Sequence, residues 1–207
     1  MIESEDQARQ FCAERLNAQG LERLEVLAAT LREENARQNL VSAGSLAAVW
    51  QRHFADSLQL VDLVPRGTGP WLDLGSGAGF PGLVLALAQP DVPVFLIESR
   101  KRRVEWLERC IELLELEHCC AIGKRLESVE TVSAAVITAR AFAPLGKLLR
   151  LSARFSTPAT VWLLPKGRSA AQELSEQPQS VQAMFHVERS RTDPGGILVG
   201  RGKPQVA

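Results

Sequence analysis

The stretch Trp71-Leu-Asp-Leu-Gly-Ser-Gly-Ala-Gly-Phe-Pro-Gly82 decides the fold of this chain. Its first four residues are typical of a short buried strand, and the apolar run at 83–88 predicts a helix after the turn. The glycines at alternate positions between them allow a sharp turn and a close approach of a ligand to the backbone. Free N–H groups at the start of the helix point back at this turn. We therefore predict a nucleotide cradle at residues 75–82.

Two acidic residues indicate which nucleotide the cradle holds. Residues 77–82 also fit G-x-G-x-x-G, which alone is a weak signal for dinucleotides. Asp73 precedes the first glycine by two positions, where a carboxylate is poorly placed beside a pyrophosphate but well placed beside a cationic amino-acid group. Glu98 ends the apolar run 92–97 at the spacing expected for a ribose contact. Because an ordinary glycine turn would not require both acids, we favour S-adenosylmethionine over NAD and predict a methyltransferase, with a dehydrogenase as the alternative.

The composition is that of a globular protein. The 207 residues are 45% hydrophobic, which suffices for one domain with an appendage. No apolar run approaches the roughly 18 residues of a transmembrane helix, and residues 1–6 are acidic, opposite to the basic start of a signal peptide. We therefore expect a cytoplasmic protein that binds no membrane. The 4 cysteines form no C-x-x-C pair and the 3 histidines supply no cluster beside them, so we expect reduced thiols and no metal.

The chain begins with a helical region. Ser4 heads a capping-box pattern before the first helix, a second helix extends to about Asn39, and Ser45 is predicted to cap a third. The segment 65–70 is rich in proline and glycine, which is typical of a turn. We therefore predict an N-terminal helical extension over residues 1–66, packed on a cofactor-binding domain at residues 67–207.

After the glycine turn, predicted strands and helices alternate. The strands fall at about 93–97, 117–122, 134–139 and 159–164, and the helices at about 83–88, 100–116, 144–154 and 167–176. This alternation predicts a mostly parallel sheet covered on both faces. Two further strands, at 181–188 and 197–200 around a turn at 193–196, predict an antiparallel C-terminal edge. The expected fold is Rossmann-like.

Charge is distributed unevenly, although the formal net charge is zero. Residues 131–172 carry 6 basic side chains and no acid. Two of these, Arg140 and Lys166, follow the fourth and fifth predicted strands, and ligands of open parallel sheets bind at the carboxyl ends of the strands. These positions favour an anionic substrate over the alternative of solvated side chains. No general base is evident there, so the sequence favours methyl transfer to an exposed ring nitrogen such as nitrogen 7 of guanine, which has no proton to lose.

Several motifs resemble the bacterial RsmG/GidB family, the 16S rRNA guanine-N7 methyltransferases. They occur in order over about residues 8–200: Asn39-Leu40, Arg52-His53-x-x-Asp56-Ser57, the stretch 73–82, Glu98-Ser99, Arg140-Ala141-Phe142 and Lys166-Gly167. The Gly-Phe-Pro-Gly turn together with the upstream Arg-His-x-x-Asp-Ser is specific to that family. The resemblance implies a class I S-adenosylmethionine-dependent methyltransferase fold with an N-terminal helical extension. It also implies a guanine in the decoding-region loop of 16S rRNA as the substrate.

The resemblance and the residue chemistry together give a candidate site. The expected cofactor contacts are Asp73, Gly75, Ser76, Gly77, Gly79, Phe80, Glu98, Leu126, Glu127 and Arg140. Arg140 is expected to position the reactants, with no general base. The expected RNA contacts are Arg52, His53, Arg102, Arg103, Arg125 and Lys166. The family commonly has Lys-Arg after its ribose acid where this chain has Arg102-Arg103, so a phosphate contact is expected there but not a specific lysine role.

The substrate and the assembly state are less constrained by the sequence. A zero net charge is unusual for an RNA enzyme, so a small-molecule methyltransferase and a non-catalytic S-adenosylmethionine-binding module remain as alternatives. Intact glycines with both acids argue against a lost cofactor site. The expected partner is 16S rRNA within the small ribosomal subunit or its precursor, and the expected state is a monomer.

Overall fold

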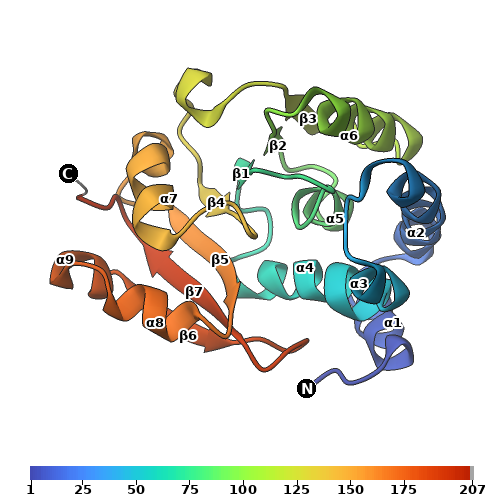
Figure 1. The fold of residues 1–207 in the computed structure, drawn as a ribbon, viewed down its shortest axis with the longest axis horizontal. Helices are drawn as coiled ribbons and strands as arrows, with labels where there is room; N and C mark the ends of the chain where they lie inside the picture. The colour runs from blue at the N-terminus through green and yellow to red at the C-terminus, as the bar shows by residue number, and fades with distance from the viewer. Residues whose placement is uncertain (206–207) are drawn as a thin grey trace.

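The computed structural model describes residues 1–205. Its centre is a 7-stranded sheet with the order β3-β2-β1-β4-β5-β7-β6 (Figure 1). β1 to β5 are parallel, and β7 is antiparallel to both β5 and β6. The strands are β1 (Trp71–Leu74), β2 (Val94–Ile97), β3 (Cys119–Ile122), β4 (Val136–Thr138), β5 (Val161–Gly167), β6 (Phe185–Arg189) and β7 (Gly196–Arg201). The predicted parallel sheet with an antiparallel C-terminal edge is confirmed.

Helices cover both faces of this sheet, as Figure 1 shows. The helices after β1 are α5 (Gly82–Ala88), α6 (Lys101–Leu113), α7 (Leu145–Ser152), α8 (Ala170–Ser175) and α9 (Gln179–Gln182), with short 3₁₀ turns η3 (Leu126–Ser128) and η4 (Ala153–Phe155). Alternate residues of β1 point to opposite faces: Trp71 joins the core under α5 and α6, and Leu72 joins the core under α7 and α8. Both side chains are fully buried, which fixes the register of the central strand.

The N-terminal region is helical, as predicted. It contains α1 (Glu5–Ala13), α2 (Ala18–Gln38), α3 (Ala43–Ala47), the π-helix η1 (Trp50–Ala55), α4 (Asp56–Leu58) and the 3₁₀ helix η2 (Gln59–Leu63). Ser4 caps α1 by accepting a hydrogen bond from the Gln7 N–H at 3.2 Å. Asn39, with a φ of 42°, ends α2 in the left-handed conformation.

The third predicted helix begins elsewhere than expected and is interrupted. Ser42, not Ser45, is its cap, because the Ser42 hydroxyl accepts from the Ser45 N–H at 3.2 Å. The break before η1 exposes new backbone donors, and the carboxylate of Glu5 accepts the N–H groups of Trp50 and Gln51 at 3.1 and 2.8 Å. A carboxylate from α1 therefore stabilises the start of a helix 45 residues later in the chain.

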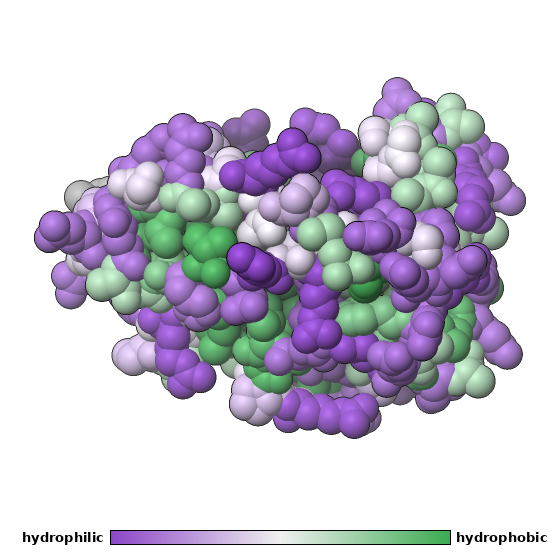
Figure 2. Space-filling view, turned by 90° about the horizontal axis from the view of Figure 1, so that it is seen from below, coloured by the Kyte–Doolittle hydropathy of each residue, from purple (hydrophilic) through white to green (hydrophobic). Residues whose placement is uncertain are grey.

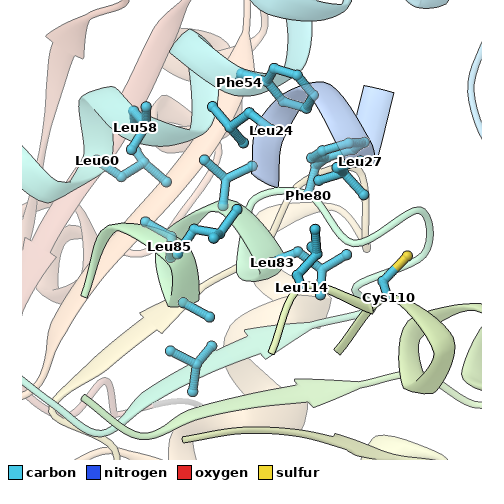
Figure 3. Close-up of a cluster of buried hydrophobic side chains, with 14 of the residues drawn as sticks. Leu24, Leu27, Phe54, Leu58, Leu60, Phe80, Leu83, Leu85, Cys110 and Leu114 are labelled. Carbon is cyan, nitrogen blue, oxygen red and sulfur yellow. The ribbon is translucent and has the colours of Figure 1, made fainter. Parts of the chain in front are cut away.

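The N-terminal helices and the sheet domain share one hydrophobic core. Leu24 and Leu27 of α2 and Phe54 of η1 belong to the same buried cluster as Leu83 and Leu85 of α5 (Figure 3). Each of these side chains has no exposed surface. This packing fixes η1 and α4 beside the carboxyl ends of the strands, and a division of the chain at residues 66 and 67 stays a prediction.

Two segments differ from the predicted secondary structure. Residues 181–184 belong to α9 and a turn instead of a strand, because the Pro178 carbonyl accepts the N–H groups of Val181 and Gln182 at 2.9 and 3.0 Å. β5 extends through Gly167, and the helix predicted from residue 167 begins at Ala170, because Gly167 pairs with Gly196 of β7. The amino end of β7 therefore lies at the same edge as the carboxyl ends of the parallel strands.

The exposed hydrophobic side chains of residues 1–205 are scattered over the surface. Hydrophilic residues cover most of the side of the molecule drawn in Figure 2, with smaller groups of hydrophobic residues between them. In residues 1–205, the large hydrophobic side chains that are exposed lie on separate elements: Met1, Val26, Leu113, Val132 and Val187. No helix in this range is long and apolar enough to cross a membrane.

Candidate active site

The glycine turn follows β1 as predicted. Gly75 and Gly77 have φ values of 66° and 57°, in the left-handed region that favours glycine. Ser76 fixes the turn from both sides: its N–H donates to the Ile97 carbonyl at 2.9 Å, and its hydroxyl donates to the Asp73 carbonyl at 3.1 Å. The turn is thus bonded to the carboxyl ends of β1 and β2, which is where proteins with an open parallel sheet bind nucleotides.

Asp73 is the most deeply buried acid of the site. Its side chain has no exposed surface, and its Oδ2 accepts the Gly82 N–H at 3.2 Å. Its Oδ1 has no hydrogen-bond partner within the described part of the chain. Burial raises the pKa of Asp73 to about 6, against the opposing hydrogen bond from the Gly82 N–H. An unpaired buried acceptor beside a glycine turn fits a cationic group of a ligand.

The carboxylate of Glu98 accepts three backbone hydrogen bonds, which the sequence alone did not predict. Its Oε2 accepts the Gly77 N–H at 3.1 Å, and its Oε1 accepts the N–H groups of Ser99 and Arg100 at 2.7 and 2.9 Å. The carboxylate therefore joins the end of β2 to the glycine turn and to the start of α6. The guanidinium of Arg103 lies 4.0 Å away and adds a positive neighbour.

A cavity of about 200 Å³ lies beside this acid. Of the predicted cofactor residues, Gly75, Glu98 and Leu126 line it; the lining also contains Ile97, Ser99, Arg100, Arg103, Lys124, Ala141 and Phe142. The remaining predicted cofactor residues do not line it. Phe80 is buried against His53, and a Cβ on Gly79 would meet Leu83 at 2.2 Å. Both residues therefore support the turn from its core side, and Glu127 is exposed on η3.

A second, larger cavity of about 920 Å³ opens at the carboxyl ends of β4 and β5. It brings together four of the predicted site residues, Arg52, His53, Arg140 and Lys166. The other predicted RNA contacts lie outside it: Arg102 and Arg125 are exposed and line neither cavity, and Arg103 lines the first one. The predicted cations therefore divide into an inner group and an outer group.

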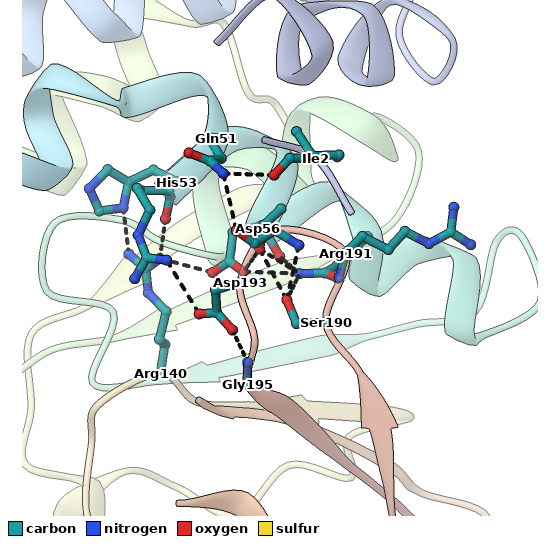
Figure 4. A network of polar contacts seen from close by, with 12 residues as sticks. Ile2, Gln51, His53, Asp56, Arg140, Ser190, Arg191, Asp193 and Gly195 are labelled. Carbon is teal, nitrogen blue, oxygen red and sulfur yellow. Dashed lines mark hydrogen bonds and ion pairs between the residues drawn. The ribbon is translucent and has the colours of Figure 1, made fainter. Parts of the chain in front are cut away.

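Arg140 is held by the N-terminal helices, as Figure 4 shows. Its guanidinium donates to the Arg52 carbonyl at 3.1 Å and to the Asp56 carboxylate at 3.3 Å, and contacts Nδ1 of His53 at 2.9 Å. It also lies over the ring of Phe80 at 5.5 Å. These contacts fix a cation whose side chain is 23% exposed at the cavity wall.

His53 is neutral in this environment. Burial, together with the positive charges of Arg140 and Arg52, lowers the pKa of His53 to about 3. The imidazole stacks on Phe80 with ring centroids 4.7 Å apart. Because Nδ1 faces the guanidinium of Arg140, it acts as an acceptor, and the proton is assigned to Nε2. His53 therefore orients Arg140 and is unsuited to proton transfer near neutral pH.

Lys166 has an acidic partner that the sequence did not indicate. Its ammonium donates to Glu173 and to the Ala143 carbonyl, at 2.9 and 2.8 Å, and its side chain is 9% exposed. Glu173 also accepts the Leu145 N–H at 2.9 Å. These bonds, chiefly with Lys166, lower the pKa of Glu173 against the effect of burial. The pair secures the segment that follows Arg140.

The two cavities share a wall formed by Ala141 and Phe142. Ala141 has a φ of 54°, a conformation that costs a residue with a Cβ about 1–2 kcal/mol. The ring of Phe142 packs on the glycine turn, so that a Cβ on Gly75 would meet it at 2.5 Å. In the sequence both residues stand out only as part of a motif, and the signal for their role is their place directly after the predicted strand that is followed by Arg140.

Similarity to known proteins shows to which family the chain belongs. The family model GidB, described as rRNA small subunit methyltransferase G, matches residues 20–192. Ribosomal RNA small subunit methyltransferase G of Erythrobacter litoralis is 63% identical over 207 residues, covering 100% of both chains. The same-named protein of Novosphingobium aromaticivorans is 55% identical over 184 residues, covering 87% of this chain and 80% of that protein. The chain belongs to the GidB family.

Solved structures agree on the fold of this GidB protein. The ribosomal protein L11 methylase of Lactobacillus delbrueckii superposes with a TM-score of 0.58 at 12% identity, covering 72% of this chain and 78% of that one. A mutant of MtNAS in complex with S-adenosylmethionine gives 0.57 at 15% identity, covering 96% and 89%. At these identities the likeness establishes the fold alone: a class I S-adenosylmethionine-dependent methyltransferase, as predicted.

The described residues of this GidB protein offer acceptors for a cofactor but no metal centre. In residues 1–205 no group of three or more His, Cys, Asp or Glu side chains is placed to hold a metal ion. All four cysteines are unpaired thiols, and burial raises the pKa of Cys12 and of Cys110 to about 12. The unpaired oxygen of Asp73 and the carboxylate of Glu98 are acceptors that could hold donor groups of S-adenosylmethionine.

Proposed function

We propose that this protein methylates ring nitrogen 7 of a guanine in the decoding-region loop of 16S rRNA. As a member of its family it is an S-adenosylmethionine-dependent rRNA methyltransferase, and the cofactor supplies the methyl group from a sulfonium centre. The observation that carries the proposal is the pair of adjoining cavities. Glu98 and Gly75 line the smaller one, Arg52, Arg140 and Lys166 line the larger one, and Ala141 and Phe142 line both.

Asp73, Glu98 and η3 are assigned to the cofactor. The unpaired Oδ1 of Asp73 accepts from the ammonium of the methionine part, and Glu98 accepts from the ribose hydroxyls. Leu126 lines the same cavity and provides an apolar surface for the adenine, with Glu127 at its rim. Gly75 lets the backbone approach the ligand, while Ser76, Gly77, Gly79 and Phe80 maintain the turn.

The chemistry that fits the second cavity needs no general base. Ring nitrogen 7 of guanine attacks with its own lone pair and loses no proton. His53 is neutral, with Nδ1 occupied by Arg140, and the carboxylates of Asp56 and Glu173 are both bound by cations. The contribution of the protein is therefore placement of the two reactants, which can supply much of the rate enhancement of such a reaction. Arg140 is the positioning residue at the shared edge.

RNA binding is assigned to the exposed cations of both groups. Arg102 and Arg125 are exposed and free to reach phosphates, and Arg52 is 45% exposed at the mouth of the larger cavity. The substrate is 16S rRNA within the small ribosomal subunit or its precursor, and the enzyme acts as a monomer in the cytoplasm, where that substrate is assembled.

A methylation assay on two substrates tests the proposal. Labelled S-adenosylmethionine is incubated with 30S subunits and with free 16S rRNA, both from a strain that lacks the modification, and the product is mapped by mass spectrometry. We expect one methyl group on nitrogen 7 of one guanine in the decoding-region loop. Gly75→Val, which places side-chain atoms against Phe142, is the inactive control. Cofactor binding without methyl transfer to either RNA would contradict the proposal.

A further inference from the structure

Three carboxylates line the larger cavity, and their hydrogen bonds leave one of them largely free. Asp56 and Glu173 each accept from three protein donors: Arg140, Gln59 and Thr192 for the first, and Lys166, Leu145 and Ser169 for the second. Asp193 accepts the Gly195 N–H at 2.6 Å, and its Oδ2 lies 3.4 Å from the guanidinium of Arg52. A carboxylate offers about four acceptor positions, so Asp193 retains the most unused capacity in the cavity.

The partner of Asp193 is readily displaced. The side chain of Arg52 is 45% exposed and that of Asp193 is 22% exposed, so their ion pair at 3.4 Å contributes about 0–1 kcal/mol. Arg52 is also a cation to which an RNA phosphate can bind. An RNA strand that engages Arg52 therefore leaves the Asp193 carboxylate facing a cavity that is large enough to receive a nucleotide.

The position of Asp193 in the fold matches one edge of a bound guanine. It lies in the loop between β6 and β7, at the same edge of the sheet as the carboxyl ends of the parallel strands. The cofactor acids end β1 and β2, and in the strand order β4 and β5 separate these from β7. Nitrogen 7 belongs to the imidazole ring of guanine, whereas N1–H and the 2-amino group belong to the pyrimidine ring, with the 2-amino group on the side of the base far from nitrogen 7. When nitrogen 7 faces the cofactor cavity, the 2-amino group therefore lies on the side away from that cavity, where β7 is.

We infer that Asp193 binds the Watson–Crick edge of the target guanine and stabilises the transition state; this rests on the proposed function. Guanine presents two donors there, N1–H and the 2-amino group, which match a carboxylate. Adenine presents an acceptor at N1 and is repelled. During transfer the lone pair of nitrogen 7 forms the new N–C bond while the S–C bond breaks and its electrons stay on sulfur. The base becomes a cation, and a carboxylate bonded to its donors stabilises the developing charge.

A base analogue and three protein variants test this assignment. The guanine that the parent enzyme methylates in 16S rRNA is mapped and then replaced by inosine, which keeps nitrogen 7 but lacks the 2-amino group. Single-turnover rates are measured at saturating S-adenosylmethionine and RNA for the parent, Asp193→Ala, Asp193→Asn and Arg52→Ala. Asp91→Asn, an exposed acid that lines a cavity at the amino ends of β2 and β3, is the matched control.

We expect inosine to slow the parent about tenfold or more, the rate equivalent of one charge-assisted hydrogen bond. Asp193→Ala should methylate the guanine RNA slowly, and the inosine RNA should not lower its rate further. The rate of Asp193→Asn should lie between those of the parent and Asp193→Ala, because its amide oxygen still accepts from N1–H. Arg52→Ala should retain the inosine penalty although its ion pair with Asp193 is lost. Asp91→Asn should behave like the parent.

The outcomes separate this assignment from the proposed function. No methylation of guanine by the parent would overturn both. A second outcome is that the parent methylates nitrogen 7, while inosine slows Asp193→Ala and Asp193→Asn as much as it slows the parent. This result would overturn the role of Asp193 alone. Loss of the penalty in Arg52→Ala would also overturn it, because the ion pair and not the carboxylate would then determine recognition.

Discussion

The guanidinium of Arg140 lies 2.9 Å from Nδ1 of His53, so the cation at the end of β4 is oriented by an imidazole from the N-terminal helices. This contact joins residues 87 positions apart in the chain. It explains why the helical extension and the cofactor domain share a site: without η1, Arg140 would lose its bonds to His53 and to the Arg52 carbonyl.

The neutral state of His53 predicts a pH dependence of stability. The native pKa of about 3 lies below the ordinary value of 6.5, so the unfolded state binds more protons between these values. The free energy of unfolding should therefore fall as the pH decreases below 6.5, by about 1.4 kcal/mol per pH unit from this residue. His53→Gln keeps an acceptor for Arg140 but does not titrate. Urea denaturation should show that between pH 6.5 and 5.0 the parent loses about 2 kcal/mol more than His53→Gln.

Equal losses in the two proteins would contradict a buried neutral imidazole. Asp73 contributes the opposite slope, because its native pKa of about 6 is raised above the ordinary 3.8 and the native state keeps its proton longer. This contribution decreases the stability as the pH rises from 3.8 to 6. It is present in both proteins and therefore cancels in the comparison.

The raised pKa of Asp73 predicts that cofactor binding releases protons. An ammonium placed against Oδ1 favours the ionised carboxylate, so binding should release about half a proton at pH 6 and very little at pH 8. Calorimetry in two buffers with different ionisation enthalpies measures this release. The affinity should weaken up to about tenfold for each pH unit below 6. Asp73→Asn should bind weakly at every pH, and a parent affinity that is constant from pH 5 to 8 would exclude the proposed pairing.

Glu98→Gln should weaken cofactor binding and destabilise the fold. One amide oxygen replaces two carboxylate oxygens that together accept the N–H groups of Gly77, Ser99 and Arg100. We expect a loss of about 1.5–3 kcal/mol in cofactor binding from the ribose contact, and a lower melting temperature of the free protein. Calorimetry and thermal denaturation in the absence of cofactor separate the two effects. Unchanged affinity with a lowered melting temperature would restrict Glu98 to a structural role.

The contact between Gly75 and Phe142 predicts a partial rescue. In Gly75→Ala the new Cβ meets the ring, and the φ of 66° costs about 1–2 kcal/mol in addition. Phe142→Ala removes the ring, so the double variant should be more stable than the sum of the two single effects, by about 0.5–3 kcal/mol. Denaturation of all four proteins measures this coupling. Additive effects would mean that the ring moves away from Gly75 without cost.

The sequence predicted the strand-turn-helix cradle and the sheet because both depend on local patterns. Apolar runs and glycine spacing determine β1 and the turn, and Glu98 follows directly from the end of β2. Local patterns could not predict which acidic residues pair with the predicted cations. Glu173 lies seven residues after Lys166, and Asp56 reaches Arg140 across 84 positions. Such pairs depend on tertiary packing, as does the Glu5 carboxylate that caps η1.

The division between outer and inner cations predicts two kinds of RNA-binding defect. Arg102 and Arg125 are exposed, so Arg102→Ala and Arg125→Ala should each make the salt dependence of RNA binding shallower by about one unit, with little effect on single-turnover rates.

Lys166 is bonded to Glu173 and the Ala143 carbonyl, so Lys166→Met should displace the segment that carries Arg140 and Phe142. A misplacement of about 1 Å can reduce the rate on the order of a hundredfold. Glu173→Gln is the matched control: it keeps every cation and removes a negative charge, so it cannot weaken the attraction to phosphate, yet it should slow the reaction as Lys166→Met does. If Lys166→Met lowered the salt slope by one unit and kept the parental rate, Lys166 would be a phosphate contact like Arg102.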